Sequence, residues 1–248
     1  GPYTTCGSAP IGLNAVTSGT GAWTAGAGTF ADSTDPSTSY TPAPSEGGTT
    51  IILTWSTTDP DGAGPCPGAF DTADLTIETP ATALAAGPYS VCSNGSVSIS
   101  VTTTPGAGSW AGGLGAFSDA TAANTTYTPV TNEAGTTVPL IWTTVDPDGA
   151  GPCPVVTDTA FVAVLEAAIA DAAGPYEVCG TGPVPLNATT NGTGAWTGGA
   201  GSFADSADPA TTYTPAASEI GTTVTLTWTT DDPDGAGPCP GASSTADL

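Results

Sequence analysis

The sequence predicts an all-β protein of three tandem immunoglobulin-like β-sandwich domains that form a semi-rigid rod. The first observation behind this prediction is a nine-residue sequence, DPDGAGPCP, that occurs unchanged at 59–67, 146–154 and 232–240. The second is that short segments of alternating apolar and polar residues, typical of half-buried strands, recur in the same order around each copy. The third is that Gly- and Pro-rich turns separate these segments and no helical periodicity is present, which together are typical of a β-sandwich.

The repeat divides the chain into three units, residues 1–86, 87–173 and 174–248, each of a normal size for a small domain. The last unit stops at Leu248, inside a segment that continues as a strand in the first unit. We therefore expect its last strand to be truncated and the chain to be a segment of a longer protein. The joins, Thr79–Ala86 and Ala167–Ala173, are short and should limit the swing between domains. Strand lengths predict a rod roughly 100 Å long at about 3.3 Å per residue.

Each unit begins with Gly-Pro-Tyr followed by a cysteine, at Cys6, Cys92 and Cys179. A short edge strand is expected here because proline holds the backbone extended and is tolerated at sheet edges. A second strand is predicted from the alternation of apolar and polar residues that follows. Its three copies are Ile11–Thr17, Val97–Thr103 and Val184–Thr190.

A Gly-rich segment comes next, with one tryptophan before it and one phenylalanine after it. We expect a hairpin whose aromatic side chains close over the core. The pairs are Trp23 and Phe30, Trp110 and Phe117, and Trp196 and Phe203. A tyrosine then follows in each unit, and its hydroxyl is expected to lie beneath a loop. These residues are Tyr40, Tyr127 and Tyr213.

The central core strand of each unit leads directly into DPDGAGPCP. In the first unit it begins at Thr49, and Ile51, Leu53 and Trp55 lie on one face. A last strand follows the nonapeptide, at Thr72–Glu78 and Thr159–Leu165.

The charge balance excludes several kinds of partner. The chain has 23 Asp and Glu residues but no Lys, Arg or His, which gives a formal charge of −23. Nucleic acids and anionic lipids would be repelled, because their recognition depends on Lys and Arg. No run of 18 apolar residues is present, so no direct membrane insertion is predicted. The acidic surface has two interpretations: it attracts divalent cations, or it only maintains solubility.

The six cysteines predict one disulfide in each domain. Six cysteines allow 15 pairings, and the repeat spacing favours Cys6–Cys66, Cys92–Cys153 and Cys179–Cys239. No closely spaced Cys or His pairs suggest a zinc site. Disulfides imply an oxidising, extracellular location. Closing a loop of this length would stabilise each domain by roughly 4 kcal/mol.

No catalytic site is predicted. Without His, Lys or Arg, and with every cysteine expected in a disulfide, the usual nucleophile–base and zinc arrangements are excluded. The acidic residues recur on turns in every unit, which suits a structural role better than a single glycosidase site. The sequence therefore indicates a protein that is not an enzyme.

Calcium is the one cofactor that the sequence suggests. Two carboxylates separated by one residue could face the same cation, with loop carbonyls as further ligands. The candidate pairs are Asp59 and Asp61, Asp146 and Asp148, and Asp232 and Asp234, with a further donor at Asp32, Asp119 or Asp205. The loop lacks the third acid and distal Glu of an EF-hand. Asp-Pro-Asp-Gly also has the residue preferences of a type I turn, and the sequence favours this turn.

The order of AGPY…C, GAWTGGAGSFAD, TTYTPAASE and GTTVTLTWTTDDPDGAGPCP resembles the tandem repeats of giant secreted adhesins of Bacteroidota. The resemblance covers all three units and implies Ig-like or PKD-like domains, type IX secretion to the cell surface and, in some relatives, gliding motility. The chain departs from it in lacking Lys and Arg and in having Tyr3, Tyr89 and Tyr176 where related repeats commonly carry Asp. It also implies O-glycosylation at Ser33, Thr72, Thr159 and Ser206.

These observations predict a repetitive stalk or adhesive segment of a large extracellular cell-surface protein, acting through length, rigidity and multivalent binding. Its expected partners are other repeats of the same long chain, surface glycans or further copies of itself. The first alternative is a subunit of a self-assembling extracellular filament or sheath, whose truncated strand a neighbouring chain completes. The second is a carbohydrate-binding module that uses the tryptophans, although their identical positions in each unit favour a core role.

Overall fold

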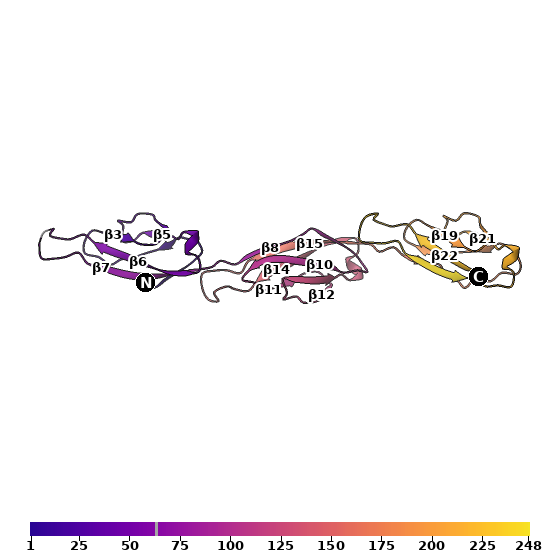
Figure 1. Ribbon diagram of the computed structural model, residues 1–248, viewed down its shortest axis with the longest axis horizontal. Helices are drawn as coiled ribbons and strands as arrows, with labels where there is room; N and C mark the ends of the chain where they lie inside the picture. The colour runs from indigo at the N-terminus through magenta and orange to yellow at the C-terminus, as the bar shows by residue number, and fades with distance from the viewer. Residues whose placement is uncertain (63) are drawn as a thin grey trace.

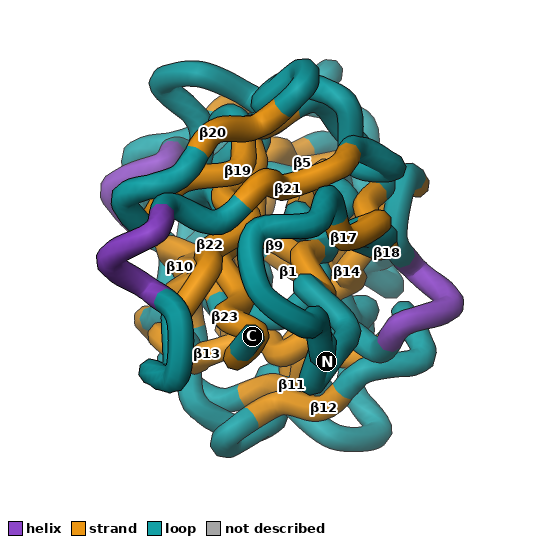
Figure 2. The backbone as a smooth tube through the Cα atoms, turned by 90° about the vertical axis from the view of Figure 1, so that its right-hand side faces the viewer, coloured by secondary structure: helices purple, strands orange, loops and turns teal. Residues whose placement is uncertain are grey.

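The protein folds into three β-sandwich domains arranged in a row, in a computed structural model that describes residues 1–62 and 64–248 (Figure 1). Ala63 of the first nonapeptide lies outside the described residues. The first domain contains strands β1–β7, the second β8–β15 and the third β16–β23. Viewed along the row, the domains overlap within one outline (Figure 2). This is the all-β, tandem immunoglobulin-like architecture that the sequence predicts.

The second domain has two four-stranded sheets, in the orders β11-β14-β15-β9 and β12-β13-β10-β8. A 3-10 helix, η2 (Thr131–Glu133), precedes the central strand β14. The strands are β8 (Thr82–Ala85), β9 (Tyr89–Cys92), β10 (Val97–Thr104), β11 (Gly108–Ala111), β12 (Ala116–Phe117), β13 (Asn124–Thr128), β14 (Thr136–Thr144) and β15 (Thr157–Leu165).

The first domain has a four-stranded sheet, β1-β7-β6-β3, and a three-stranded sheet, β2-β5-β4. Its elements are β1 (Tyr3–Cys6), β2 (Ile11–Gly12), β3 (Gly21–Thr24), β4 (Thr29–Phe30), β5 (Ser39–Thr41), η1 (Pro44–Glu46), β6 (Thr49–Thr57) and β7 (Phe70–Glu78).

The third domain has the sheets β19-β22-β23, β17-β21-β20 and β16-β18. Its elements are β16 (Ala170–Asp171), β17 (Val184–Pro185), β18 (Thr189–Thr190), β19 (Gly194–Gly198), β20 (Ser202–Phe203), β21 (Thr212–Thr214), η3 (Ala217–Glu219), β22 (Thr225–Thr230) and β23 (Ser243–Asp247). The described helices are these 3-10 turns, and none has the length and apolarity needed to cross a membrane.

Consecutive domains face opposite sides of the row. In Figure 1, β3 and β5 of the first domain lie on the same side as β19 and β21 of the third. In the second domain, β11, which is the equivalent of β3 and β19, lies on the other side together with β12. The row is therefore built by one repeated step, in which each domain is turned relative to the one before it.

A pair of tryptophans lies at the centre of each core. Trp110 on β11 and Trp142 on β14 are cross-strand partners, with ring centroids 5.5 Å apart in an edge-to-face arrangement. Such a pair stabilises by about 0.5–1.5 kcal/mol beyond the area it buries. The same pair recurs in the other domains, and all six tryptophans are buried: Trp23, Trp55, Trp110, Trp142, Trp196 and Trp228. The predicted core role of the tryptophans is confirmed.

The predicted hairpin at the Gly-rich segment is wrong. β3 pairs with β6 in one sheet, whereas β4 pairs with β5 in the other, so the glycines carry the chain between the two sheets. The turn packs closely over Tyr40, and a Cβ on Gly28 would lie 2.7 Å from the Tyr40 hydroxyl. Gly26 has a φ of +79°, a backbone conformation that favours glycine. The turn can therefore close over Tyr40 only with glycine at these positions.

The segments expected to be short joins are partly strands of the following domain, β8 and β16. β8 pairs with β10, and β16 pairs with β18, in antiparallel register. Ala83 and Ala85 pack against the core of the second domain, and Ala172 is fully buried in the third. Alternate residues of a strand face the core, and alanine is small enough to pack there. Each domain from the second onward therefore includes a strand that the sequence assigns to the joins.

Candidate functional site

The disulfides connect neighbouring domains, so the predicted pairing within each domain is wrong. Cys6 of the first domain is bonded to Cys153 of the second, with Cα atoms 5.1 Å apart. Cys92 of the second is bonded to Cys239 of the third, with Cα atoms 4.9 Å apart. Both bonds span 147 residues of sequence, so one linkage is used twice. The two junctions are the most distinctive chemical feature of the described chain.

The strand order explains why the two cysteines of one domain cannot meet. β9 runs parallel to β15, which places Cys92 opposite Leu165, at the end where the chain leaves the domain. Cys153 lies in the loop before β15, at the other end of that nine-residue strand. The strand separates them by roughly 27 Å at about 3.3 Å per residue, whereas bonded cysteines have Cα atoms within about 7 Å. The repeat spacing fits pairing within a domain and pairing between neighbouring domains equally well. The parallel pairing of β9 with β15 decides in favour of the second.

The nonapeptide forms a loop that reaches toward the preceding domain, and its aspartates hold its shape. Asp146 Oδ1 accepts hydrogen bonds from the N–H groups of Asp148 and Gly149, at 3.2 and 2.9 Å. Asp148 Oδ2 accepts one from the N–H of Cys153, at 2.9 Å. The loops of the other two domains have the same bonds. These hydrogen bonds set the position of the second cysteine, and the type I turn stays a prediction from the sequence.

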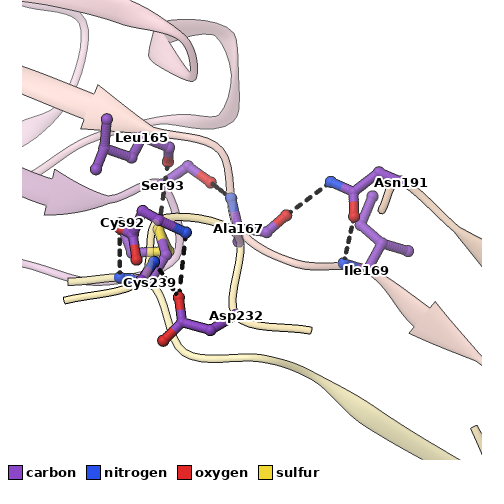
Figure 3. Close-up of a disulfide and its surroundings, with 10 residues drawn as sticks. Cys92, Ser93, Leu165, Ala167, Ile169, Asn191, Asp232 and Cys239 are labelled. Atoms are coloured by element: carbon purple, nitrogen blue, oxygen red, sulfur yellow. Dashed lines mark hydrogen bonds between the residues drawn. A yellow bond between two sulfur atoms is a disulfide. The ribbon is translucent and has the colours of Figure 1, made fainter. Parts of the chain in front are cut away.

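Figure 3 shows the junction between the second and third domains around Cys92–Cys239. The N–H of Ala167 donates to Ser93 Oγ at 3.1 Å, and its carbonyl accepts from Asn191 Nδ2 at 2.9 Å. Asn191 Oδ1 accepts from the N–H of Ile169 at 2.8 Å. Residues from both domains therefore hold the connecting segment, and both disulfide cysteines are buried.

The junction between the first and second domains uses different contacts at equivalent positions. Gly7 follows Cys6 where Ser93 follows Cys92, and Pro80 stands where the second junction has Ala167. A Cβ on Gly7 would lie 3.0 Å from the Pro80 ring, and Gly7 has a φ of +51°. Proline has no N–H to donate, so this junction relies on packing where the second uses a hydrogen bond.

The two remaining cysteines carry no disulfide in the described chain. Cys66 and Cys179 are both free and exposed, which departs from the prediction that all six are bonded. Cys66 lies in the nonapeptide loop of the first domain, and Cys179 follows the Gly-Pro-Tyr sequence of the third. Their equivalents in the other domains are all bonded to a neighbouring domain: Cys66 corresponds to Cys153 and Cys239, and Cys179 corresponds to Cys6 and Cys92.

A Tyr–Glu pair ties the Gly-rich turn to the 3-10 helix in each domain, and its glutamate is buried in the first two domains and partly buried in the third. The Tyr127 hydroxyl lies 2.7 and 2.8 Å from the carboxylate oxygens of Glu133, and it accepts the N–H of Gly115 at 3.0 Å. Glu133 also accepts the N–H groups of Leu114 and Val130. The sequence predicted the buried tyrosine but missed its partner, although Glu follows Tyr by six residues in every unit, at Glu46, Glu133 and Glu219.

Hydrogen bonding keeps these glutamates ionised. Burial alone would raise the pKa of Glu133, but the N–H of Leu114, the Tyr127 hydroxyl and the N–H of Val130 together hold that pKa below its ordinary value. Burial, the hydrogen bond to Glu133 and its charge raise the pKa of Tyr127 to about 12. The pair is therefore a neutral tyrosine donating to a carboxylate across the physiological range.

The acidic residues proposed as calcium ligands are placed as follows. No group of three or more Asp, Glu, Cys or His side chains in the described ranges is arranged to share a metal ion. Asp32 and its equivalent Asp119 instead accept hydrogen bonds within their own loops, from Thr34 and Thr121. A cleft of about 440 Å³ at the second junction includes Glu166, Asp231, Asp232 and Asp234 in its lining. Calcium at the Asp-Pro-Asp pairs stays a prediction from the sequence.

The four serines and threonines proposed for O-glycosylation lie on the outer surface or at strand starts. Ser206 and Thr72 are exposed, whereas Ser33 and Thr159 are partly buried. These modifications also stay predictions.

No family model and no curated protein matches the chain. Solved structures that match the chain include the EC1-3 segment of mouse protocadherin-24, at 11% identity over 99% of this chain and 95% of that chain, with a TM-score of 0.43. The EC22-24 segment of mouse cadherin-23 has 16% identity over 99% and 94%, with a TM-score of 0.40. The insect immune protein hemolin, whose structure was described with implications for homophilic adhesion, has 9% identity over 98% and 72%, with a TM-score of 0.38. The fold assignment here rests on the strand order of the chain itself.

Proposed function

We propose that the chain is a stalk segment of a large extracellular cell-surface protein, which acts through length, rigidity and multivalent binding. The observation that carries the proposal is the repeated disulfide between neighbouring domains, Cys6–Cys153 and Cys92–Cys239. Each junction thus has two covalent connections, the backbone and the disulfide, on a row of three domains (Figure 1). Two connections restrict bending and twisting, which is useful in a spacer and has no evident use in a catalytic domain.

The other features are consistent with a position outside the cell. Disulfides persist in oxidising compartments, and a formal charge of −23 without a single Lys or Arg keeps long chains apart by repulsion. The resemblance to Bacteroidota adhesin repeats supports a cell-surface location, and type IX secretion is part of the same proposal. Adhesive contacts would then be made by the many exposed copies of the repeat, to surface glycans or to other repeats.

Small-angle X-ray scattering with and without reductant tests the stalk function. The Cys66→Ala, Cys179→Ala double variant is used to keep the chains monomeric. Oxidised protein should scatter as a stiff rod roughly 100 Å long. Reduction should broaden the distance distribution and lower the radius of gyration, while the far-UV circular dichroism stays unchanged. Identical scattering before and after reduction would overturn the proposal, because the junction disulfides would then add no stiffness.

Calcium at the Asp-Pro-Asp loops is a separate proposal. Among the described residues, the loops of the second and third domains each leave one buried carboxylate oxygen without a hydrogen-bond partner, Asp148 Oδ1 and Asp234 Oδ1. Calcium there would gain two protein oxygens per loop beside backbone carbonyls, fewer than the six to eight ligands it prefers. The test is thermal unfolding with added calcium and with a chelator: equal midpoints reject the site.

O-glycosylation is a further proposal. An intact mass equal to the bare polypeptide rejects glycosylation in protein isolated from its source.

A further inference from the structure

The two free cysteines are the unpaired halves of the linkage that the chain already uses twice. In both disulfides, the cysteine that follows the Gly-Pro-Tyr sequence of one domain, at the end of β1 or β9, is bonded to the nonapeptide cysteine of the next domain. Cys179 follows Gly-Pro-Tyr in the third domain, where residues 176–179 form no strand, and Cys66 is a nonapeptide cysteine. The chain therefore presents one half of the linkage at each end of the row.

The described residues of the loop that carries Cys66 make the same aspartate hydrogen bonds as the bonded loops. Asp61 Oδ2 accepts the N–H of Cys66 at 3.1 Å, as Asp148 does for Cys153 at 2.9 Å and Asp234 for Cys239 at 3.0 Å. The difference is burial: Cys153 and Cys239 are 2% and 0% exposed, whereas Cys66 is exposed. The loop is shaped for the bond, and only the neighbouring domain is missing.

A second feature of the first domain indicates the same missing neighbour. In the second and third domains, Thr102 and Thr189 pair with the incoming strands β8 and β16. The equivalent residue of the first domain is Val16, which has no strand beside it and is 99% exposed. The first domain therefore lacks, around the same sheet, both the strand and the disulfide that a preceding domain supplies elsewhere in the chain.

Cys179 is accessible at the opposite end of the row. It lines a hollow of about 540 Å³ together with Thr222 and Leu248. Its equivalent, Cys92, is 4% exposed because the nonapeptide loop of the third domain covers it. The exposed thiol of Cys179 is thus in the position that receives such a loop.

We propose that Cys66 and Cys179 join further domains of the same repeat type head to tail, each through one inter-domain disulfide. The occupant at Cys66 is the outgoing end of another such domain, and the occupant at Cys179 is another nonapeptide loop. Bond formation consumes two thiols and one low-molecular-weight disulfide such as oxidised glutathione. It produces the protein disulfide and two reduced thiols, which carry away the two protons and two electrons. This inference rests on the proposed stalk function and extends it to a covalently continuous row.

The test uses a second copy of the chain as the added repeat. A Cys66→Ala chain keeps only Cys179 free, and a Cys179→Ala chain keeps only Cys66 free. Each variant alone, and an equal mixture of the two, is incubated in a glutathione redox buffer and examined by non-reducing electrophoresis. The mixture should form a dimer at least tenfold more abundant than in either variant alone. The double variant should remain monomeric.

Peptide mapping identifies the bond in the dimer. Cleavage after acidic residues is suitable because the chain has no site for trypsin. The expected product links the peptide that contains Cys66 to the one that contains Cys179, with both internal disulfides intact. Equal dimer formation in either single variant, or capture of both thiols by glutathione in the mixture, would overturn the proposal. Either result leaves the stalk function untouched, because scattering of the monomeric double variant tests that function separately.

Discussion

The first and second domains are copies of the same repeat but differ in the number of strands in one of their sheets. The second has two four-stranded sheets, whereas the first has a four-stranded and a three-stranded sheet. β10 spans eight residues, and its counterpart β2 spans only two. The same nonapeptide holds a buried disulfide cysteine in the second domain and an exposed thiol in the first.

The difference lies in the neighbours. The second domain receives β8 from the segment after the first domain, and it is bonded to the first through Cys153 and to the third through Cys92. The first domain has no domain before it in this chain and has one bond, through Cys6. A repeat of this kind is therefore completed by the domains on either side of it, and its stability should depend on its position in the row.

The largest expected effect is the loss of both junction disulfides. In the second domain, the segment between Cys92 and Cys153 is fixed at both ends to folded neighbours. Releasing a segment of about 60 residues removes roughly 4 kcal/mol of chain-entropy stabilisation, which lowers the unfolding midpoint of a domain this size by about 16–32 °C. We expect the Cys153→Ala, Cys239→Ala variant to destabilise the second domain more than the first.

Hydrogen exchange followed by mass spectrometry of peptic fragments resolves the three domains in that experiment. The Cys66→Ala, Cys179→Ala variant is the matched control, since it also replaces two cysteines and should leave all three domains unchanged. Equal destabilisation of the three domains would contradict the dependence on position.

The second expected effect concerns the Tyr–Glu pair, which does not depend on neighbours. Glu133→Ala leaves the Tyr127 hydroxyl and the N–H groups of Leu114 and Val130 without their acceptor. We expect a loss of about 3 kcal/mol, because hydrogen bonds to a buried carboxylate are strong and their donors would stay unsatisfied. Glu46→Ala should cost the first domain a similar amount, and Glu177→Ala, at an exposed position, should cost nothing measurable. Denaturant titration with domain-resolved hydrogen exchange checks this, and a large difference between the two domains would show that the pair also depends on neighbours.

The sequence predicted the parts of the fold that depend on one unit alone. Alternation along Thr136–Thr144 gave the central strand, and the recurring Trp110 and Trp142 gave the core. Both depend on period-two alternation and burial, which are visible within a single unit. The Tyr–Glu pair was also accessible, because Tyr and Glu recur six residues apart, but alternation does not reveal a hydrogen bond between a strand and the 3-10 helix that follows it.

The sequence failed where structure depends on how units meet. The disulfide pairing follows from β9 lying parallel to β15, a long-range pairing that spacing does not encode. The alanines of Thr82–Ala85 were interpreted as part of a join, because small residues are common in linkers. Small residues are equally suited to a strand that packs against a core, which is what this segment forms. The candidate site therefore emerged only from the arrangement of the domains.

The third expected effect is a dependence of stability on pH with two limits. The folded-state pKa of Glu133 lies below its ordinary value of 4.5, so its contribution is present above that value and is lost as the pH falls through the folded pKa. The folded-state pKa of Tyr127 is raised from 10.0 to about 12, so its contribution is present below pH 10 and is lost as the pH rises from 10 to about 12.

Comparison of wild type with Glu133→Gln isolates this contribution from the general repulsion among 23 acidic groups. The stability difference between the two proteins should be constant between pH 6 and 9 and should shrink below about pH 4.5. Chemical denaturation at each pH measures it. A difference that stays constant down to pH 2 would show that ionisation of Glu133 does not contribute.

The smallest expected effect compares the two junctions. Ser93→Ala removes the acceptor for the N–H of Ala167 at the second junction, whereas the first junction has Gly7 and Pro80 at these positions and no such bond. The loss should be about 1 kcal/mol, which corresponds to roughly fivefold faster exchange of the Ala167 amide. The cost stays local because the disulfide Cys92–Cys239 still holds the domains together. Ser96→Ala, three residues away and exposed, is the control and should leave this amide unchanged. If Ser93→Ala also has no effect, the disulfide and the Asn191 contacts alone order the connecting segment, and the two junctions are equivalent despite their different residues.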